Sequence, residues 1–251
     1  MKQINDNTLS EPPYHVVAVG AHPDDVEIAC GGTLAKLATQ GYRVAIVDLT
    51  DGEPTPRCDD PAVRLAEASQ AAAILGVHRI VLSLPNRRLM DSFEARALLA
   101  TQFRRLRPSM VIGFGCKTPM ASPDHYQAMQ ITDPAVFYSR LTKWDKHFEH
   151  LPPHTISAQL YFRLAFEQFS LMDHTHSITV DISEHLQTKI QSILCYQTQF
   201  PPERRNVIQR VEAHAIATGM AAGFEAGESF ISTRAIGCQD LLRTILHHPS
   251  E

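Results

Sequence analysis

The sequence predicts an α/β protein built on a doubly wound, mostly parallel β-sheet with helices on both faces. Up to about residue 140, short apolar runs rich in β-branched residues alternate with longer runs in which apolar residues recur at helical spacing. Gly and Pro residues stand where those helices would begin or end. Strands separated by helices form right-handed βαβ units, which place the strands side by side and parallel.

The elements of this first part follow one another without long gaps. "HVVAVGA" is an apolar run typical of a strand buried on both faces. Asp60-Pro61 is typical of a helix start, Gly41 and Gly76 of helix ends, and Pro108 stops the third helix. Strands are predicted at residues 15–21, 43–50, 79–84 and 110–115, and helices at 31–41, 60–76 and 91–108.

The pattern is weaker in the second part of the chain. Strands are predicted at residues 158–166 and 177–183, and helices at 184–200, 206–227 and 238–246. The Pro-rich stretch around Pro152 marks a loop, and no internal repeat or low-complexity segment is present. We therefore expect one domain over residues 1–251, with a smaller C-terminal extension of strands and helices and a disordered tail at 1–13.

Composition narrows the classes of partner. A formal charge of −4 argues against a nucleic-acid binder, which needs clustered Lys and Arg. The run at 104–107 is short and is interpreted as a solvated face. The scattered cysteines include no CxxC pair, the polar N-terminus has no apolar core of a signal peptide, and no apolar run approaches the ~20 residues that cross a bilayer. The expectation is a soluble cytoplasmic protein with no membrane or nucleic-acid partner.

Three polar clusters follow predicted strands: "HPDDVE" at 22–27, "TDGEPTPR" at 50–57 and "SPDH" at 122–125. In open parallel sheets, ligands bind outside the carboxyl ends of the strands. A dinucleotide site would need G-x-G-x-x-G after the first strand, and "GAHPDDVEIACGG" lacks that glycine spacing. Asp48 could imitate the ribose-binding acid, but without these glycines it is a weak signal.

The same clusters suit a metal ion. His22 and Asp25 lie three residues apart across a turn fixed by proline, and His125 offers a third ligand from another strand end. Two His and one carboxylate with an open position form a ligand set of catalytic zinc. Asp24, next to a ligand yet free, could act as general base. A cation would also turn the repulsion among His22's neighbouring acids, Glu27 included, into attraction.

Two plainer interpretations stay open for these residues. "HPDD" could be a turn in which Asp24 or Asp25 caps the following helix. His125 could be an ordinary loop histidine. The presence of a "PD" motif at both strand-end loops of one sheet favours the metal interpretation.

These motifs resemble a known family. "AHPDDVE" resembles the signature of the LmbE-like, or PIG-L, zinc-dependent N-acetylglucosamine (GlcNAc) deacetylases, and "PDH" resembles their second motif. The resemblance extends over about residues 14–246 and includes "LTDGEPTPR" and "RLAEASQAAAILGV". "VDIS", "KIQSILCYQTQF" and "AGESF" are similar to the bacillithiol-pathway branch, which deacetylates GlcNAc-malate.

The resemblance implies a Rossmann-like fold, a zinc cofactor, and hydrolysis of the N-acetyl group of a small molecule that contains glucosamine. It also implies a homo-oligomer, either a trimer or a hexamer. By position, His22, Asp25 and His125 match the zinc ligands, and Asp24 matches the general base.

Four further residues are candidate substrate contacts. Glu53, Arg57 and Arg64 match places where the family often has substrate-contacting or site-shaping residues. Arg87 is added from its place after the third strand, because an arginine fork can accept a carboxylate such as that of malate. The alternative for each arginine is an ordinary ion pair.

The chain departs from the family at Ser122. The family usually has His there, which stabilises the oxyanion and protonates the leaving amine. Serine can donate a hydrogen bond but cannot act as a cationic acid. His174 and His176 could supply an imidazole, could be an exposed pair, or could form a second metal site. Two other functions therefore stay open: an amidase of thiol conjugates, and a zinc-binding relative with impaired catalysis.

Overall fold

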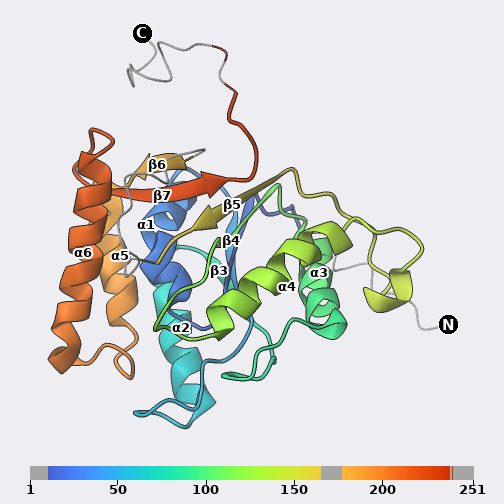
Figure 1. Cartoon of the computed structure of the whole chain (residues 1–251), viewed down its shortest axis with the longest axis horizontal. Helices are drawn as coiled ribbons and strands as arrows, with labels where there is room; N and C mark the ends of the chain where they lie inside the picture. The colour runs from blue at the N-terminus through green and yellow to red at the C-terminus, as the bar shows by residue number, and fades with distance from the viewer. Residues whose placement is uncertain (1–10, 165–176, 238, 240–251) are drawn as a thin grey trace.

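The computed structural model describes residues 11–164, 177–237 and 239, and contains one seven-stranded sheet in the order β3-β2-β1-β4-β5-β7-β6 (Figure 1). Strands β1 to β5 are parallel, whereas β7 is antiparallel to β5 and to β6. The prediction of a mostly parallel α/β fold is confirmed. The strands are β1 Val16–Gly20, β2 Val44–Asp48, β3 His78–Val81, β4 Met110–Phe114, β5 Ala158–Phe162, β6 Ser177–Asp181 and β7 Gly227–Ser232.

The helices form two groups with the sheet between them (Figure 1). One group joins α1, α2, α5 and α6, and in the other α3 packs on α4. None of the described helices is long and apolar enough to cross a membrane. The helices are α1 Asp25–Thr39, α2 Pro61–Leu75, α3 Phe93–Leu106, α4 Asp124–Tyr138, α5 Leu186–Leu194 and α6 Arg205–Met220, with short 3₁₀ turns at Asp145–His147, Ser183–His185 and Pro202–Arg204.

The local start and stop signals of the first half act as predicted. The Asp60 carboxylate accepts a hydrogen bond from the Ala62 amide at the start of α2, and Gly76 ends this helix in the left-handed conformation. Every residue of β1 and β2 is buried, because helices cover both faces of the sheet. Because β2 and β4 both pair in parallel with β1, the carboxyl ends of these three strands lie at one edge of the sheet. The loops at that edge carry the polar clusters.

Several elements from α4 onward differ from the prediction. The sequence predicts a loop at "SPDH", but Asp124 begins helix α4. The helix predicted at 184–200 ends at Leu194, and the one predicted at 206–227 ends at Met220. Residues 227–232 instead form β7, which pairs between β5 and β6. The strand predicted at 158–166 ends at Phe162. The last two residues of that predicted strand, His174, His176 and all of the helix predicted at 238–246 except residue 239 lie outside the described residues.

The turn between α6 and β7 explains the boundary error. A Cβ at Gly219 would lie 2.4 Å from the Ala226 carbonyl carbon, so the end of α6 packs directly on the start of β7. Gly223 has φ +85° and reverses the chain between them. The Ala-rich composition of this stretch favours a helix, but strand pairing with residues far away in the sequence overrides it.

Candidate active site

The loop between β1 and α1 holds one carboxylate in a fixed orientation. Oδ2 of Asp25 accepts hydrogen bonds from the backbone amides of Ala21, at 3.0 Å, and His22, at 2.9 Å. The other carboxylate oxygen of Asp25, Oδ1, faces His125 and lies 3.2 Å from Nε2 of its imidazole. The preceding residue, Asp24, has φ 122°. Such a conformation costs a non-glycine residue about 1–3 kcal/mol, and strain of this kind is typical of functional sites.

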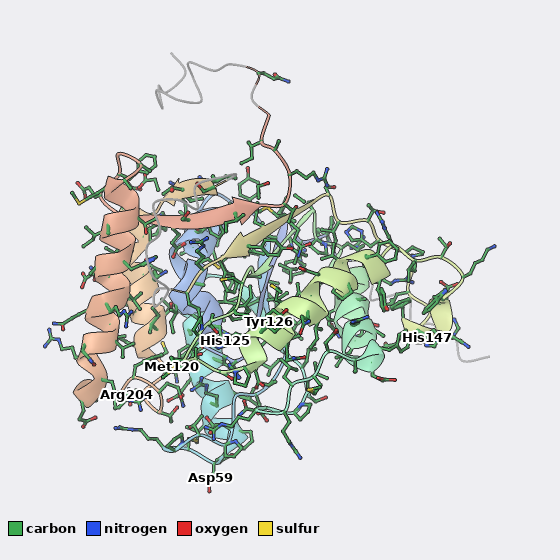
Figure 2. All side chains as sticks on the ribbon, in the orientation of Figure 1. Asp59, Met120, His125, Tyr126, His147 and Arg204 are labelled. Carbon is green, nitrogen blue, oxygen red and sulfur yellow. The ribbon has the colours of Figure 1, made fainter. Side chains whose placement is uncertain are left out.

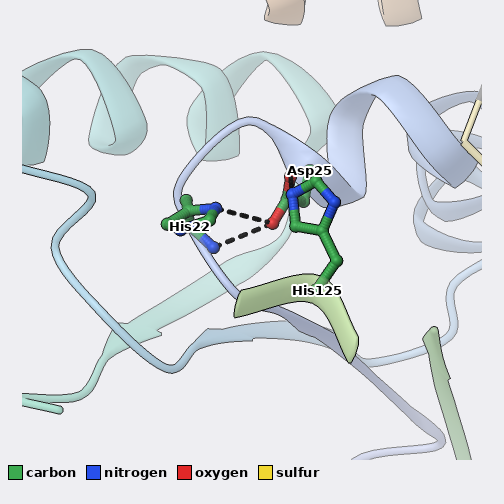
Figure 3. Close-up of side chains that lie close together, drawn as sticks. All are labelled: His22, Asp25 and His125. Atoms are coloured by element: carbon green, nitrogen blue, oxygen red, sulfur yellow. Dashed lines mark hydrogen bonds and ion pairs between the residues drawn. The ribbon is translucent and has the colours of Figure 1, made fainter. Parts of the chain in front are cut away.

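Three side chains converge in a way that fits a metal ion. His22, Asp25 and His125 each offer a ligand atom, and these atoms lie within 4.8 Å of one another. Figure 3 shows His22 and Asp25 on the loop that leads into α1, and His125 facing them from α4. Two imidazoles and one carboxylate suit zinc and similar divalent ions.

The outer nitrogen of each imidazole has a partner. Nε2 of His22 lies 3.1 Å from Oδ2 of Asp124, and Nδ1 of His125 lies 2.8 Å from Oγ1 of Thr118. Asp124 is itself held by the backbone amide of Arg87, 2.7 Å away. Contacts of this kind orient the rings of metal-binding histidines. Neither Asp124 nor Thr118 is predicted from the sequence, although Asp124 lies inside the "PDH" motif, which could have identified it.

Burial and charge act differently on the acids of this loop. Burial raises the pKa of Asp24 from 3.8 to about 7, against the opposing charge of Arg64. Burial also opposes ionisation of Asp25, but His125 and His22 hold its pKa far below the usual range. His22 is buried as well, yet Asp124 and Asp25 outweigh burial and raise its pKa from 6.5 to about 10 in the chain alone. Asp25 therefore stays ionised at neutral pH, whereas Asp24 can gain or lose a proton near pH 7.

Asp24 does not cap α1. Although it occupies the position before the helix, its side chain makes no capping hydrogen bond. Its Oδ2 instead lies 3.0 Å from Nη2 of Arg64, which also donates to the Pro23 carbonyl oxygen. Arg64 is only 2% exposed, and its Nε and Nη1 have no hydrogen-bond partner within the described part of the chain. The arginine thus holds Asp24 and keeps two donors available.

A cavity of about 300 Å³ contains the three converging side chains and Asp24 in its wall. Its apolar wall includes Ile28, Leu164 and Phe200. Figure 2 shows His125 at the start of α4 and Arg204 at the lower end of α6. The other polar residues of the wall are Thr55, Arg64, Asn86, Arg87, Ser122, Gln199 and Arg204.

The cavity includes three of the five remaining predicted residues. Arg64, Arg87 and Ser122 line it, and Oγ of Ser122 accepts from the Asp124 amide at 3.3 Å. Glu53 and Arg57 do not line it. The Glu53 carboxylate is buried and accepts from the Thr55 amide and hydroxyl, whereas Arg57 is exposed beside Glu203. The predicted substrate contacts of Glu53 and Arg57 stay predictions, and the structure adds Asn86, Gln199 and Arg204 as lining residues that the sequence analysis missed.

Glu27, the last acid of "HPDDVE", belongs to a different cluster. Its carboxylate is fully buried and pairs with Arg79, which also binds Asp48 at 2.6 Å. The Tyr196 hydroxyl donates to Glu27 at 2.7 Å. The expectation that one cation holds all the acids of this motif is therefore wrong for Glu27, and Asp48 also faces Arg79.

Comparison with known proteins agrees with this geometry. Residues 17–136 match the family model described as PIG-L: GlcNAc-PI de-N-acetylase. The chain carries a PIG-L family domain. This confirms the predicted family resemblance.

The alignments with two relatives each cover about three quarters of the chain. Diacetylchitobiose deacetylase of Thermococcus kodakarensis is 29% identical over 198 residues, which cover 75% of this chain and 71% of the relative. A 1D-myo-inositol 2-acetamido-2-deoxy-alpha-D-glucopyranoside deacetylase of Actinosynnema mirum is 29% identical over 235 residues, covering 76% of this chain and 82% of the relative. The conserved protein TT1542 of Thermus thermophilus has a similar structure, with a TM-score of 0.77 and 27% identity over 91% of this chain and 98% of that one. The similarity to the bacillithiol branch stays a prediction.

Proposed function

We propose that this protein is a zinc-dependent hydrolase that removes the N-acetyl group from a small molecule containing GlcNAc. The observation that carries the proposal is the convergence of His22, Asp25 and His125 in a cavity wall, with Asp24 beside them. The family model and the relatives described above are named as deacetylases, which supports the same reaction.

The roles of the residues follow from their positions. His22, Asp25 and His125 would hold a divalent ion, which would supply a Lewis acid for the acetyl carbonyl and for water. Asp24, whose pKa is raised to about 7, takes the proton of the attacking water as the water oxygen bonds to the carbonyl carbon. The nitrogen then gains the proton that Asp24 took from water, the carbon–nitrogen bond breaks, and the products are acetate and a free amine. Ser122 lines the same cavity and can donate a hydrogen bond to the carbonyl oxygen.

For the substrate, we propose GlcNAc joined to a small acid, as in the bacillithiol precursor. Arg87 and Arg204 both line the cavity, and neither has a carboxylate partner in the described part of the chain. Among the described residues, the Arg204 guanidinium makes one hydrogen bond, 3.4 Å long, to the Gln199 carbonyl oxygen. A planar guanidinium binds a carboxylate through two parallel hydrogen bonds, so two such groups favour an acidic aglycone.

A different function class depends on Ser122. A protein that binds zinc and an amino-sugar ligand without turnover would have the same metal ligands but lack a strong proton donor at this position. A thiol-conjugate amidase would use the same site on another amide. By the family resemblance we also propose a cytoplasmic homo-oligomer, a trimer or hexamer, which light scattering tests.

The deciding experiment combines metal analysis with a substrate panel. Purified protein is analysed for zinc and then assayed for acetate and amine release from GlcNAc-malate, GlcNAc-inositol, diacetylchitobiose and a thiol conjugate of glucosamine. We expect about one zinc per chain and release of acetate, fastest from GlcNAc-malate. Zinc and ligand binding without acetate release would contradict the hydrolase proposal, and release from the thiol conjugate alone would favour the amidase.

A further inference from the structure

Helix α1, which begins with Asp25, is broken near its start. Cys30 has φ −146° and ψ 21°, values outside the helical range. The break separates a single turn, Asp25–Ala29, from the rest of the helix. Backbone groups on either side of such a break lose partners within the helix and need others.

One buried ion pair serves both sides of this break. The Lys189 ammonium from α5 donates to the Ile28 carbonyl oxygen at 2.8 Å, where the first turn ends. The Glu228 carboxylate from β7 accepts from the amides of Gly32, at 3.0 Å, and Thr33, at 2.7 Å, where the second segment begins. The two charged groups lie 2.5 Å apart, and each side chain is 3% exposed.

The charges match the helix ends that they bind. A carboxylate is favourable at the amino end of a helix, and an ammonium is favourable at the carboxyl end. Gly32 makes the approach possible, because a Cβ there would lie 2.7 Å from Cδ1 of Ile182 and 3.2 Å from Oε1 of Glu228. The glycine thus allows the β6 end and the Glu228 carboxylate to lie directly against the helix backbone.

The short turn carries parts of the proposed active site. Asp25 is its first residue and offers a metal ligand, and Ile28 lines the cavity. A single helical turn is not stable by itself in water, so its direction depends on what binds it. The turn is held on one side by the ion pair between Glu27 and Arg79. Its carboxyl end is held by the hydrogen bond from Lys189 to the Ile28 carbonyl oxygen.

We propose that Lys189 and Glu228 are positioning residues, which set the orientation of the Asp25–Ala29 turn and thereby the affinity of the site for its metal ion. This inference rests on the proposed function, because it assumes that Asp25 is a metal ligand. It assigns a role to "AGESF" and "KIQSIL", two segments that contribute no residue to the cavity wall.

The test compares Glu228→Gln, Lys189→Met and the double variant, each as the full chain. Zinc dissociation constants are measured by competition with a chelator, and thermal unfolding is recorded on the same samples. Each single variant should bind zinc at least about tenfold more weakly, as loss of supporting contacts usually does. The double variant should regain thermal stability, because no buried charge is left alone, but should not regain zinc affinity.

The Lys36–Asp181 pair provides the matched control. Lys36 lies on the second segment of α1 and contacts β6, with 3.7 Å between its ammonium and the Asp181 carboxylate. Lys36→Met should leave the zinc dissociation constant unchanged. In kinetic assays, the Glu228 and Lys189 variants should lose kcat with little change in KM, because the arginines that line the cavity are untouched.

Two results would overturn the positioning role. One is parental zinc affinity in the double variant, which folds without the pair and so isolates its effect on the site. The other is an equal loss of zinc affinity in Lys36→Met. A parent protein that releases acetate in either case leaves the proposed function standing.

Discussion

Asp25 and Glu27 lie two residues apart in one turn, and both are buried. They differ in the side chains that they contact. Glu27 faces Arg79, a cation that belongs to the protein and whose side chain is 5% exposed. Asp25 faces the imidazoles of His22 and His125, which can release a proton and bind a metal ion. The partner, and not the acid or its burial, therefore separates a structural carboxylate from a functional one.

The two clusters also differ in how their partners are arranged. Arg79 donates hydrogen bonds to Glu27 and Asp48 through several of its N–H groups. The Tyr196 hydroxyl donates a further hydrogen bond to the Glu27 carboxylate. A guanidinium stays charged at any pH that the fold survives, so this cluster is fixed. At Asp25 the ligand atoms point toward a common centre.

Arg79→Leu should lower the free energy of unfolding by about 3–5 kcal/mol, because it leaves two buried carboxylates without a cation. Urea unfolding followed by circular dichroism measures this loss. Arg43→Leu is the control, since Arg43 pairs with the exposed Glu11 and should lose about 1 kcal/mol or less. Equal losses in the two variants would show that the Glu27 cluster does not hold the fold in the way described.

Asp24→Asn should lower kcat about 10²–10⁴-fold, the usual cost of removing a general base. The amide keeps the size of the side chain but cannot take a proton from water. Acetate release measures the rate, and zinc analysis of the same sample should give the parental content. A variant that loses zinc and recovers full turnover on added metal would mean that the roles of Asp24 and Asp25 are reversed.

Ser122→His should raise kcat on a GlcNAc substrate several-fold. An imidazole donates a stronger hydrogen bond to the carbonyl oxygen and can protonate the leaving nitrogen, and loss of one oxyanion donor usually costs about 10²–10³-fold. Ser122→Ala is the matched control and should be slower than the parent. An unchanged rate in both variants would place the proton donor elsewhere.

The smallest effect is expected at Asp181. Although burial opposes it, hydrogen bonds from Ser183 and the charge of Lys36 lower the pKa of Asp181. A lowered pKa stabilises the folded protein above the unfolded-state pKa, about 3.9, and this stabilisation is lost as pH falls through the folded-state value. Asp181→Asn should therefore reduce unfolding free energy at pH 7 by about 1 kcal/mol or less, and the difference from the parent should shrink below pH 4. A difference independent of pH would contradict this assignment.

The fold was most predictable where the signals are local. The strands and helices up to β4 follow from β-branched runs and from stops such as Gly76, which each act within a few residues. Helix α4 was missed because Pro134 and Asp133 interrupt its helical pattern. Strand β7 was missed because its pairing partners, β5 and β6, are set by the whole sheet.

The site shows the same division. His22 and Asp25 are predicted as metal ligands because they are neighbours in one loop. His125 is predicted as the third ligand because loops after parallel strands meet at the carboxyl edge of the sheet. The partners that neutralise the other acids could not be predicted in this way. Arg79 lies 52 residues from Glu27, and Lys189 lies 39 residues from Glu228, with no local pattern that connects them.

The most direct test of the account is the zinc content of three proteins, measured by elemental analysis after dialysis: the parent, Asp24→Asn and His125→Ala. We predict about one zinc per chain in the first two and none in the third, with urea unfolding showing that His125→Ala remains folded. Full zinc occupancy in folded His125→Ala would contradict the central claim that His22, Asp25 and His125 form the metal site.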